Sequence, residues 1–433
     1  MAAATYAAIG ALVLYAVVWT ICLNGLRVAR SRYGKAPAAS RLSALPSTSV
    51  PGVSVIRPLC GLDSNMYSTL ESVMRLNYSN YEVIFALQDP KDEALPVVRK
   101  VMSRHPHVPA RVVINSAKVG VNPKVNNLME PVAQASHDIL WVLDATIAVL
   151  PDTLGHMVDA FLGRQGDEES ATLIADSERP PPSRGMVGLV HQVPIAVVYQ
   201  PSWGSLIEQA YLNSTHAKMY LSINNVAIES CIVGKSCMYS RANINSLSSP
   251  APSLASKDVK GLAGFGPFMA EDNMIGLAVW HELGLKHTMT GDVACDFLGT
   301  LSVRDYCMRR TRWIRVRKRM TLPATTMEPL TESIVASLYG AWAVNTLFGM
   351  PKLVFWVLSM SAWLATDLAV RKALATKVRH VGPPQPTGRF LLAWAARECL
   401  ALPIWIYSML GSSVMWRGKA YRVLASGEAR RID

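Results

Sequence analysis

The longest apolar segments lie at the two ends of the chain. Residues 1–26 contain no charged side chain, and the run from Ala7 to Leu26 is long enough to cross a hydrocarbon core as a helix. Four basic residues follow this run: Arg27, Arg30, Arg32 and Lys35. A cleaved signal peptide would instead have its basic residues in front of a shorter apolar stretch. The pattern therefore predicts a retained transmembrane anchor over residues 1–26, with its C-terminal side in the cytosol.

A second apolar region predicts C-terminal membrane helices over residues 333–415. Two spans are expected at Ile334–Met350 and Leu353–Val370. A third stretch, Phe390–Val414, is interrupted by two adjacent charges and a proline: Arg397, Glu398 and Pro403. Charges inside a span are unfavourable unless they face protein or water. The third stretch is therefore expected either to form two short re-entrant pieces or to be a helix packed against its neighbours.

Positive charge is concentrated near these apolar segments. The net charge is +12, and a dense basic run lies at Arg309–Arg319. An anionic bilayer surface and a diphosphate ligand explain this charge better than nucleic acid does, because the apolar spans are adjacent. The loop 371–389 and the basic tail 416–433 cannot both be cytosolic if a single span separates them. The positive-inside rule thus favours the re-entrant alternative for the third stretch.

Between the apolar ends, short apolar runs alternate with segments of helical spacing. Strands are expected at Val53–Pro58, Glu82–Leu87, Arg111–Asn115 and Ile139–Leu143. Helices are expected at Met66–Leu76, Glu93–His105 and Asn126–Ala135. This alternation predicts an α/β domain over residues 51–319, built on a doubly wound sheet with right-handed crossovers.

Three segments depart from the alternating pattern. Residues 27–50 are expected to form a cytosolic linker, and residues 320–332, apolar with two prolines, an interfacial segment. The charged, proline-containing stretch 164–184 has little to bury and is expected to be a disordered surface insertion. A catalytic lid is the alternative for that stretch, although nothing in it resembles a ligand-binding pattern.

Most of the chain's candidate acids follow or abut a short apolar run: Asp89, Asp92, Asp144, Glu271 and Asp272. Carboxylates gathered at the carboxyl edge of an α/β sheet are typical of a nucleotide-sugar site. Each acid also has a simpler explanation. Asp89 and Asp92 suit a turn and a helix cap, Asp144 suits a loop after a strand, and Asp272 suits the cap of a helix expected at Met274–Trp280.

A basic and aromatic motif follows the acids along the chain. Arg309 and Arg312 are three residues apart, so on a helix they share one face, and Trp313 adds a stacking surface. Two guanidinium groups held in this way could grip a diphosphate. The alternative is a juxtamembrane basic helix that touches lipid head groups, which is the preferred explanation for the basic residues from Arg315 to Arg319.

The chain resembles the ceramide glucosyltransferase family, in its fungal form, whose members are membrane enzymes that make glucosylceramide from UDP-glucose. Seven stretches in order carry the resemblance: Pro51–Ser54, Tyr81–Val83, Lys118–Leu128 (KVGVNPKVNNL), Pro151–Leu154, Gly188–His191, Ala270–Asp272 and Leu322–Thr325. The run Lys118–Leu128 is long and highly specific. The resemblance implies a GT-A-type nucleotide-sugar-binding domain that faces the cytosol, in a multi-pass protein of the Golgi or endoplasmic reticulum membrane.

The resemblance also implies roles for individual residues. Asp92 matches the family's first aspartate, with Asp89 as a second candidate for nucleoside contact, and Asp144 matches the second aspartate, near the diphosphate and its metal ion. Asp272 matches the third and is implied to be the general base for the ceramide hydroxyl, next to Glu271. The remaining implied substrate-binding residues are Lys124 and Asn127, on the loop before a helix, with His216, Arg309, Arg312 and Trp313.

One departure from the wider glycosyltransferase pattern concerns the metal. The sequence Asp144-Ala145-Thr146 lacks the second acid of the usual Asp-x-Asp motif. Magnesium or manganese would then have one direct carboxylate there, with water, diphosphate or another acid completing its shell. A divalent cation is therefore a hypothesis.

The resemblance thus implies an inverting transfer of glucose from UDP-glucose to the primary hydroxyl of ceramide, giving β-glucosylceramide. The implied partners are UDP-glucose, ceramide and the lipid bilayer, without nucleic acid, and the oligomeric state is left open. Two alternatives remain. A processive polysaccharide synthase of the chitin or hyaluronan type shares the acids and the closing motif but needs a helical channel. A membrane scaffold that keeps an inactive transferase fold predicts no turnover.

Overall fold

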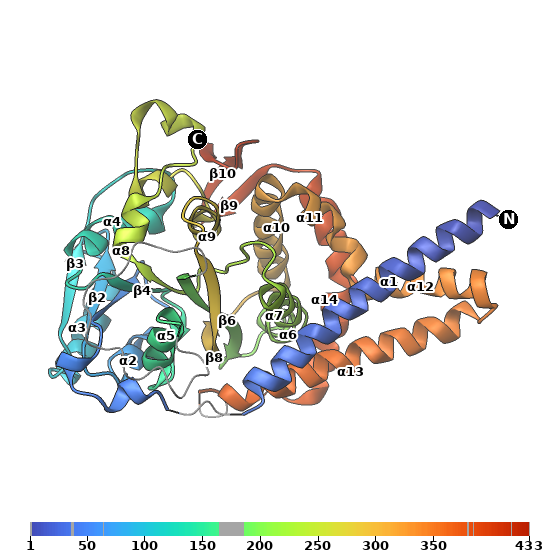
Figure 1. The fold of residues 1–433 in the computed structure, drawn as a ribbon, viewed down its shortest axis with the longest axis horizontal. Coiled ribbons are helices and arrows are strands. Elements are labelled where there is room, and N and C mark those ends of the chain that lie inside the picture. Colours follow the sequence, from blue (N-terminus) through green and yellow to red (C-terminus); the bar gives the residue numbers. More distant parts are fainter. Residues whose placement is uncertain are drawn as a thin grey trace.

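The structure is a computed structural model that describes residues 2–35, 39–63, 65–163, 186–378, 381–383, 385–416 and 418–432. An α/β domain forms one end of the molecule, and helices from both ends of the chain project from it (Figure 1). The stretch 164–184, for which a disordered insertion is expected, lies outside the described residues.

The centre of the domain is an eight-stranded sheet with the order β3-β2-β1-β4-β7-β6-β8-β5. Its first half is parallel, as the alternating pattern predicts, and consists of β1 (Val53–Pro58), β2 (Tyr81–Leu87), β3 (Ala110–Ile114) and β4 (Ile139–Leu143). These four bounds differ from the predicted strands by at most one residue at either end.

The second half of the sheet is mixed, which the alternating pattern of the first half did not predict. Its strands are β5 (Ile147–Ala148), β6 (Val187–Val198), β7 (Ser236–Ser240) and β8 (Lys286–Leu298). Strand β7 is antiparallel to both β4 and β6, and β5 is antiparallel to β8. The sequence did not reveal this reversal, because apolar runs of this length fit parallel and antiparallel strands equally well.

Helices cover both faces of the sheet, so the α/β prediction is confirmed. On one face, alternate side chains of β1 and β2 pack against α2 (Met66–Val73), α3 (Ala94–Arg104) and α5 (Thr153–Phe161). On the other face, Ile56 and Ile84 pack against α4 (Pro123–Gln134) and α9 (Glu271–His281). Successive side chains of a strand point to opposite faces, which produces two separate cores.

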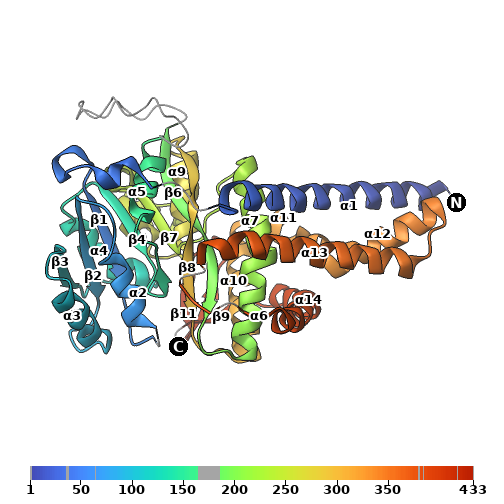
Figure 2. The ribbon, with the colours of Figure 1, turned by 90° about the horizontal axis from the view of Figure 1, so that it is seen from below.

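Three helices run side by side away from the domain, with the N-terminus at their far end (Figures 1 and 2). They are α1 (Ala2–Val28), α12 (Ser333–Phe348) and α13 (Lys352–Val378). Helix α1, with the π-helical turn Ala29–Tyr33 that continues it, and helix α13 are long and apolar enough to cross a membrane, whereas α12 is a shorter apolar helix. Helix α1 extends beyond the predicted anchor into the expected linker.

The third C-terminal apolar stretch is one helix, α14 (Thr387–Met409), which includes Pro403. This corrects the expectation of two short re-entrant pieces and bears out the alternative of a helix packed against its neighbours. Arg397 and Glu398 are buried and paired with each other, so their charges do not face lipid. Helix α14 is also long and apolar enough to cross a membrane, but it is seen end-on where α1 and α13 run across the view (Figure 2).

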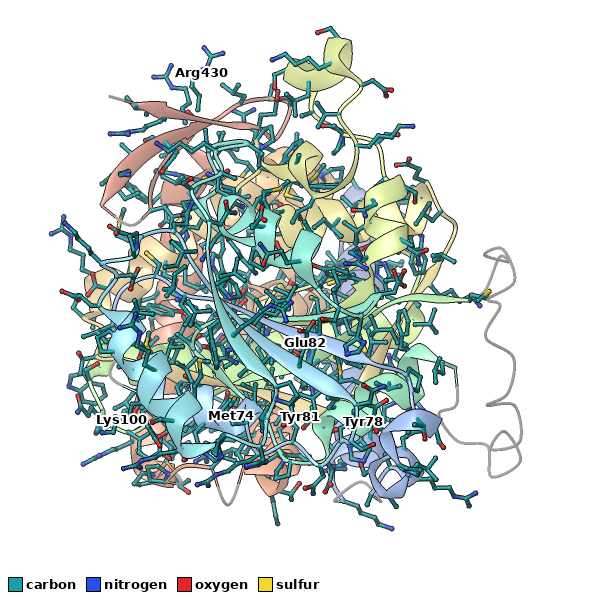
Figure 3. The ribbon with its side chains drawn as sticks, turned by 90° about the vertical axis from the view of Figure 1, so that its left-hand side faces the viewer. Met74, Tyr78, Tyr81, Glu82, Lys100 and Arg430 are labelled. Atoms are coloured by element: carbon teal, nitrogen blue, oxygen red, sulfur yellow. The ribbon has the colours of Figure 1, made fainter. Side chains whose placement is uncertain are left out.

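The expected basic tail is also corrected. Residues 413–432 form a three-stranded antiparallel sheet of β9 (Ser413–Trp416), β10 (Lys419–Val423) and β11 (Ala429–Ile432). Its apolar side chains pack against Val316 of α10 (Val303–Met320), and Phe268 bridges to Glu428. Arg430 of this sheet lies at the opposite end of the domain from Tyr81, where β2 begins (Figure 3).

Candidate functional site

Asp144 stands directly after β4, at the junction of the two halves of the sheet. Its backbone N–H donates to the carbonyl of Lys235, the residue before β7, so the antiparallel pairing of β4 with β7 places Lys235 beside it. The buried guanidinium of Arg57 donates to the carbonyls of Ala145 and Ile147 at 3.1 and 2.7 Å. These bonds hold the turn after β4 and fix the position of the Asp144 carboxylate.

The first turn of α4 brings a lysine to Asp144. Asn122 caps this helix by accepting a hydrogen bond from the Lys124 N–H at 2.8 Å. The Lys124 Nζ lies 2.7 Å from Asp144 Oδ1 and 3.1 Å from Glu271 Oε1, and it donates to the carbonyl of Gly234 at 2.9 Å. One ammonium group thus joins segments that are far apart in sequence.

The Glu271-Asp272 pair occupies the first turn of α9, where carboxylates interact favourably with the helix dipole. Glu271 Oε2 accepts a hydrogen bond from Asn122 Nδ2 at 2.7 Å, which ties the start of α9 to the start of α4. Asp272 Oδ2 accepts a hydrogen bond from the backbone N–H of Gly234. Gly234 therefore contacts both Asp272 and Lys124, through its N–H and its carbonyl.

A small, open pocket lies at these groups. Lys124, Gly234, Glu271 and Asp272 form its polar side, and the remaining lining residues are Leu128, Val142, Leu189, Cys237, Tyr239 and Ile275. The pocket therefore has the composition expected of a ligand site, with apolar walls and a few convergent polar groups.

Burial and neighbouring charges shift the pKa values of Asp272 and Asp144 in opposite directions. Burial, together with the charge of Glu271, raises the pKa of Asp272 to about 6. Burial would also raise the pKa of Asp144, but the ammonium groups of Lys124 and Lys235 hold that pKa below its ordinary value. At neutral pH Asp272 is thus a carboxylate that can accept a proton readily, whereas Asp144 is a firmly ionised partner for cations.

A row of alternating charges continues from the pocket to α10. Lys235 Nζ lies 3.5 Å from Asp144 Oδ2 and 3.3 Å from Asp296 Oδ2, and Arg309 Nη2 lies 3.9 Å from the same Asp296 oxygen. Arg309 Nε donates to Glu208 Oε1 at 2.8 Å. The row, in spatial order, is Glu271, Lys124, Asp144, Lys235, Asp296, Arg309 and Glu208.

Aromatic rings surround the arginine end of this row. The guanidinium of Arg309 stands 5.2 Å from the Trp313 ring centre. His216 stacks on Tyr220 with ring centres 5.5 Å apart, and its ring centre lies 6.5 Å from that of Trp313. Burial, with the charge of Arg310, lowers the pKa of His216 to about 3, so this imidazole is neutral at physiological pH.

Comparison with known proteins identifies the family to which this arrangement belongs. The model of glycosyl transferase family 21 matches residues 12–168 and 181–429. The chain belongs to glycosyl transferase family 21.

Curated relatives agree with this assignment over nearly the whole chain. The chain is 31% identical to a ceramide glucosyltransferase of Komagataella phaffii over 96% of this chain and 90% of the relative. It is 30% identical to a ceramide glucosyltransferase of Candida albicans over 86% of each chain.

Among solved structures, the chain is similar to a mannosyltransferase from Pyrobaculum calidifontis in complex with GDP-Man and Mn²⁺. The TM-score is 0.44 at 16% identity, covering 90% of this chain and 98% of that one. A glucosyl-3-phosphoglycerate synthase from Mycobacterium tuberculosis, in complex with Mn²⁺, UDP and phosphoglyceric acid, matches with a TM-score of 0.36 at 13% identity, covering 68% and 84%.

In this family 21 chain, the first predicted acids lie in a turn after β2. Asp92 accepts hydrogen bonds from the backbone N–H groups of Gly61, at 3.0 Å, and of Ala94, at 2.8 Å. Asp89 accepts one from the N–H of Lys91 at 2.8 Å. Asp92 thus ties the segment after β1 to the start of α3, and Asp89 holds a turn; the nucleoside contacts of both residues remain a prediction.

Lys124 and Asn127 belong to α4 itself and not to the loop before it, which corrects their expected placement. Asn127 is buried, and its Nδ2 donates to the carbonyls of Leu59 and Ala86 at 3.0 and 3.1 Å, so its amide joins the ends of β1 and β2. Arg312 is half-buried on α10, the helix that also positions Arg309 and Trp313.

The structure adds three charged residues that sequence reasoning missed: Glu208, Lys235 and Asp296. Asp296 and Glu208 are 1% and 0% exposed. Ionisable residues are seldom so buried without a partner. The signal for Asp296 was its position inside the apolar run of β8, between Cys295 and Phe297. Their charged partners come from other elements of the fold, which a single sequence does not show.

Proposed function

We propose that this family 21 enzyme transfers glucose from UDP-glucose to the primary hydroxyl of ceramide with inversion, giving β-glucosylceramide. The ceramide glucosyltransferases of two fungi, each about 30% identical to this chain, support glucose as the transferred sugar and ceramide as the acceptor. The observation on which the proposal depends is the meeting of Asp272, Lys124 and Asp144 beside one pocket.

Asp272 is the proposed general base. Inversion in one step requires the acceptor oxygen to attack the anomeric carbon while a base removes its proton. With a pKa of about 6, Asp272 is ionised at neutral pH yet basic enough to take that proton. The Gly234 N–H holds one of its oxygens in place.

The departing UDP would be neutralised by cationic groups along the charged row. Lys235 and Arg309 are the proposed diphosphate contacts, because Lys235 lies between Asp144 and Asp296 and Arg309 lies beside Asp296. Arg312, Trp313 and His216, together with Asp89 and Asp92, remain proposed substrate contacts.

A divalent cation at Asp144 is part of the proposal. Within the described parts of the chain, no three His, Cys, Asp or Glu side chains are arranged as a complete metal site. The oxygen donors present, a carboxylate on Asp144 and a nearby buried carboxylate on Asp296, fit Mg²⁺ or Mn²⁺ when diphosphate oxygens supply further ligands. Such an ion would neutralise charge on the leaving diphosphate.

We also propose how the protein sits in the membrane of the Golgi or endoplasmic reticulum. Helices α1, α12 and α13 cross the bilayer, whereas α14 lies along its cytosolic surface, packed mainly against α6 (Trp203–Tyr211) and α10. The loop 371–389 and the sheet 413–432 then share the cytosolic side, which removes the conflict with the positive-inside rule. The 16 residues of α12 give about 24 Å, close to the hydrocarbon thickness.

The interfacial segment gives the acceptor a route to the site. In α11 (Leu322–Met327) the side chains of Leu322 and Met327 are exposed, although both are apolar. This short helix follows α10 directly, so lipid that contacts it is also near the helix that holds Arg309 and Trp313. We propose that ceramide enters sideways from the bilayer at this segment.

The direct test uses purified full-length protein with UDP-glucose and a short-chain ceramide. The proposal predicts a product that extracts into organic solvent and has a β-anomeric glucose by NMR. A water-insoluble polymer would instead identify a polysaccharide synthase, and the absence of any UDP-glucose turnover would identify an inactive scaffold.

A further inference from the structure

Asp296 lies next to the residue at which an Asp-x-Asp motif would have its second acid. Thr146 occupies the position of the second acid in an Asp-x-Asp motif. In the sheet, β5 pairs with β8 so that Ile147 lies opposite Asp296, and Thr146 Oγ1 donates to Asp296 Oδ1 at 2.6 Å. The Asp296 carboxylate of β8 is thus hydrogen-bonded to Thr146, the residue at the position of the missing acid.

The second oxygen of Asp296 faces a position that attracts cations. Asp296 is 1% exposed, and its Oδ2 receives no hydrogen bond. The nearest positive group is Lys235 Nζ at 3.3 Å, and this ammonium lies 3.5 Å from Asp144 Oδ2. One cation therefore already bridges carboxylates from β8 and from the end of β4. A buried carboxylate oxygen that accepts no hydrogen bond is otherwise disfavoured.

We propose that Asp144 and Asp296 together hold the divalent cation, and that Lys235 Nζ occupies the same position when the ion is absent. The Thr146 hydroxyl keeps Asp296 in place, and diphosphate oxygens complete the coordination. Small divalent ions such as Mg²⁺ are commonly held by one or two carboxylates and substrate phosphates, which matches this donor set. The inference rests on the proposed nucleotide-sugar function, since the diphosphate supplies the remaining ligands.

The charge balance of the site distinguishes this inference from a purely structural ion pair. If the ammonium of Lys235 competes with the metal, its removal must strengthen metal binding, because two carboxylates are then left with one fewer positive neighbour. If Lys235 and Asp296 only brace the fold, removal of the ammonium leaves Asp296 with Arg309, at 3.9 Å, as its remaining positive neighbour, and it gives no gain in metal affinity.

The experiment measures Mn²⁺ binding by loss of the free-ion EPR signal, with the full-length protein in detergent. Asp296→Asn is expected to weaken Mn²⁺ binding in the presence of UDP by at least about tenfold. Asp292→Asn is the matched control, because Asp292 is equally buried on the same strand but pairs with His156 at 2.6 Å. This control is expected to bind Mn²⁺ as the wild type does.

Lys235→Gln provides a test of opposite sign, which loss of folding cannot imitate. Without nucleotide, this variant is expected to bind Mn²⁺ more tightly than the wild type. Unchanged Mn²⁺ binding in Asp296→Asn, or no gain in Lys235→Gln, overturns the inference. Lipid product from the wild type in the same preparations would show that the proposed function still stands, whereas absence of product would count against the function itself.

Discussion

Gly234 gives the sharpest test of the proposed base. A Cβ atom at this position would lie 2.5 Å from Oδ2 of Asp272 and 2.6 and 2.7 Å from its Cβ and Cγ. Ordinary van der Waals contact begins at 3.4 Å, so Gly234→Ala must displace the aspartate or the backbone by about 1 Å. A misplacement of that size at a reacting group lowers turnover by about a hundredfold, or about 2.7 kcal/mol.

The assay is the steady-state kcat for glucose transfer to short-chain ceramide. Gly388→Ala is the matched control, since a Cβ there meets nothing within 4 Å, and it is expected to leave kcat unchanged. In the Asp272→Asn background, Gly234→Ala is expected to add little further loss, because the group that it displaces is already disabled. Wild-type turnover in Gly234→Ala would refute the assignment of Asp272 as the base.

Three further predictions concern titration, stability and membrane topology. The charge of Glu271 contributes to the raised pKa of Asp272, so Glu271→Gln is expected to lower that pKa. The acid limb of the pH profile of kcat/KM should then move from about pH 6 to lower pH. An acid limb that moves to higher pH or does not move would contradict this prediction. Lys218 forms a fully buried ion pair with Asp367 of α13 at 2.7 Å, so Lys218→Met is expected to destabilise the protein by about 3–5 kcal/mol. The measurement is the Tm in detergent, which is expected to fall. An unchanged Tm would contradict a stabilising role for this ion pair. In sealed vesicles, protease added outside is expected to remove a tag from the sheet 413–432 but not from the N-terminus, and removal of both or neither would exclude the proposed crossing of α1, α12 and α13.

Local sequence features predicted much of the first half of the fold. Strands β1 to β4 and helices α2 and α3 follow from patterns among neighbouring residues. The predicted strand ends agree with the structure to within one residue, whereas some helix ends differ by more. The reversal at β7 and the sheet 413–432 were missed. Both depend on pairing between distant strands, and in the C-terminal sheet the basic residues conceal the short apolar alternation.

The site could be predicted in part for the same reason. Their places next to short apolar runs singled out Asp144, Glu271 and Asp272, and the family resemblance added Lys124; the structure brings these four together. Sequence reasoning could not find the partners of Arg309, because Glu208 and Asp296 come to it from α6 and β8. Nor could it orient α14, whose composition suits a span equally well.

The most direct measurement is glucose transfer by wild type and Asp272→Asn, followed by mass spectrometry and NMR of the lipid product. The account predicts that the wild type makes β-glucosylceramide. It also predicts that Asp272→Asn keeps its Tm and its affinity for UDP but loses several hundredfold or more in kcat. Turnover by Asp272→Asn close to that of the wild type, or a product other than glucosylceramide, would contradict it.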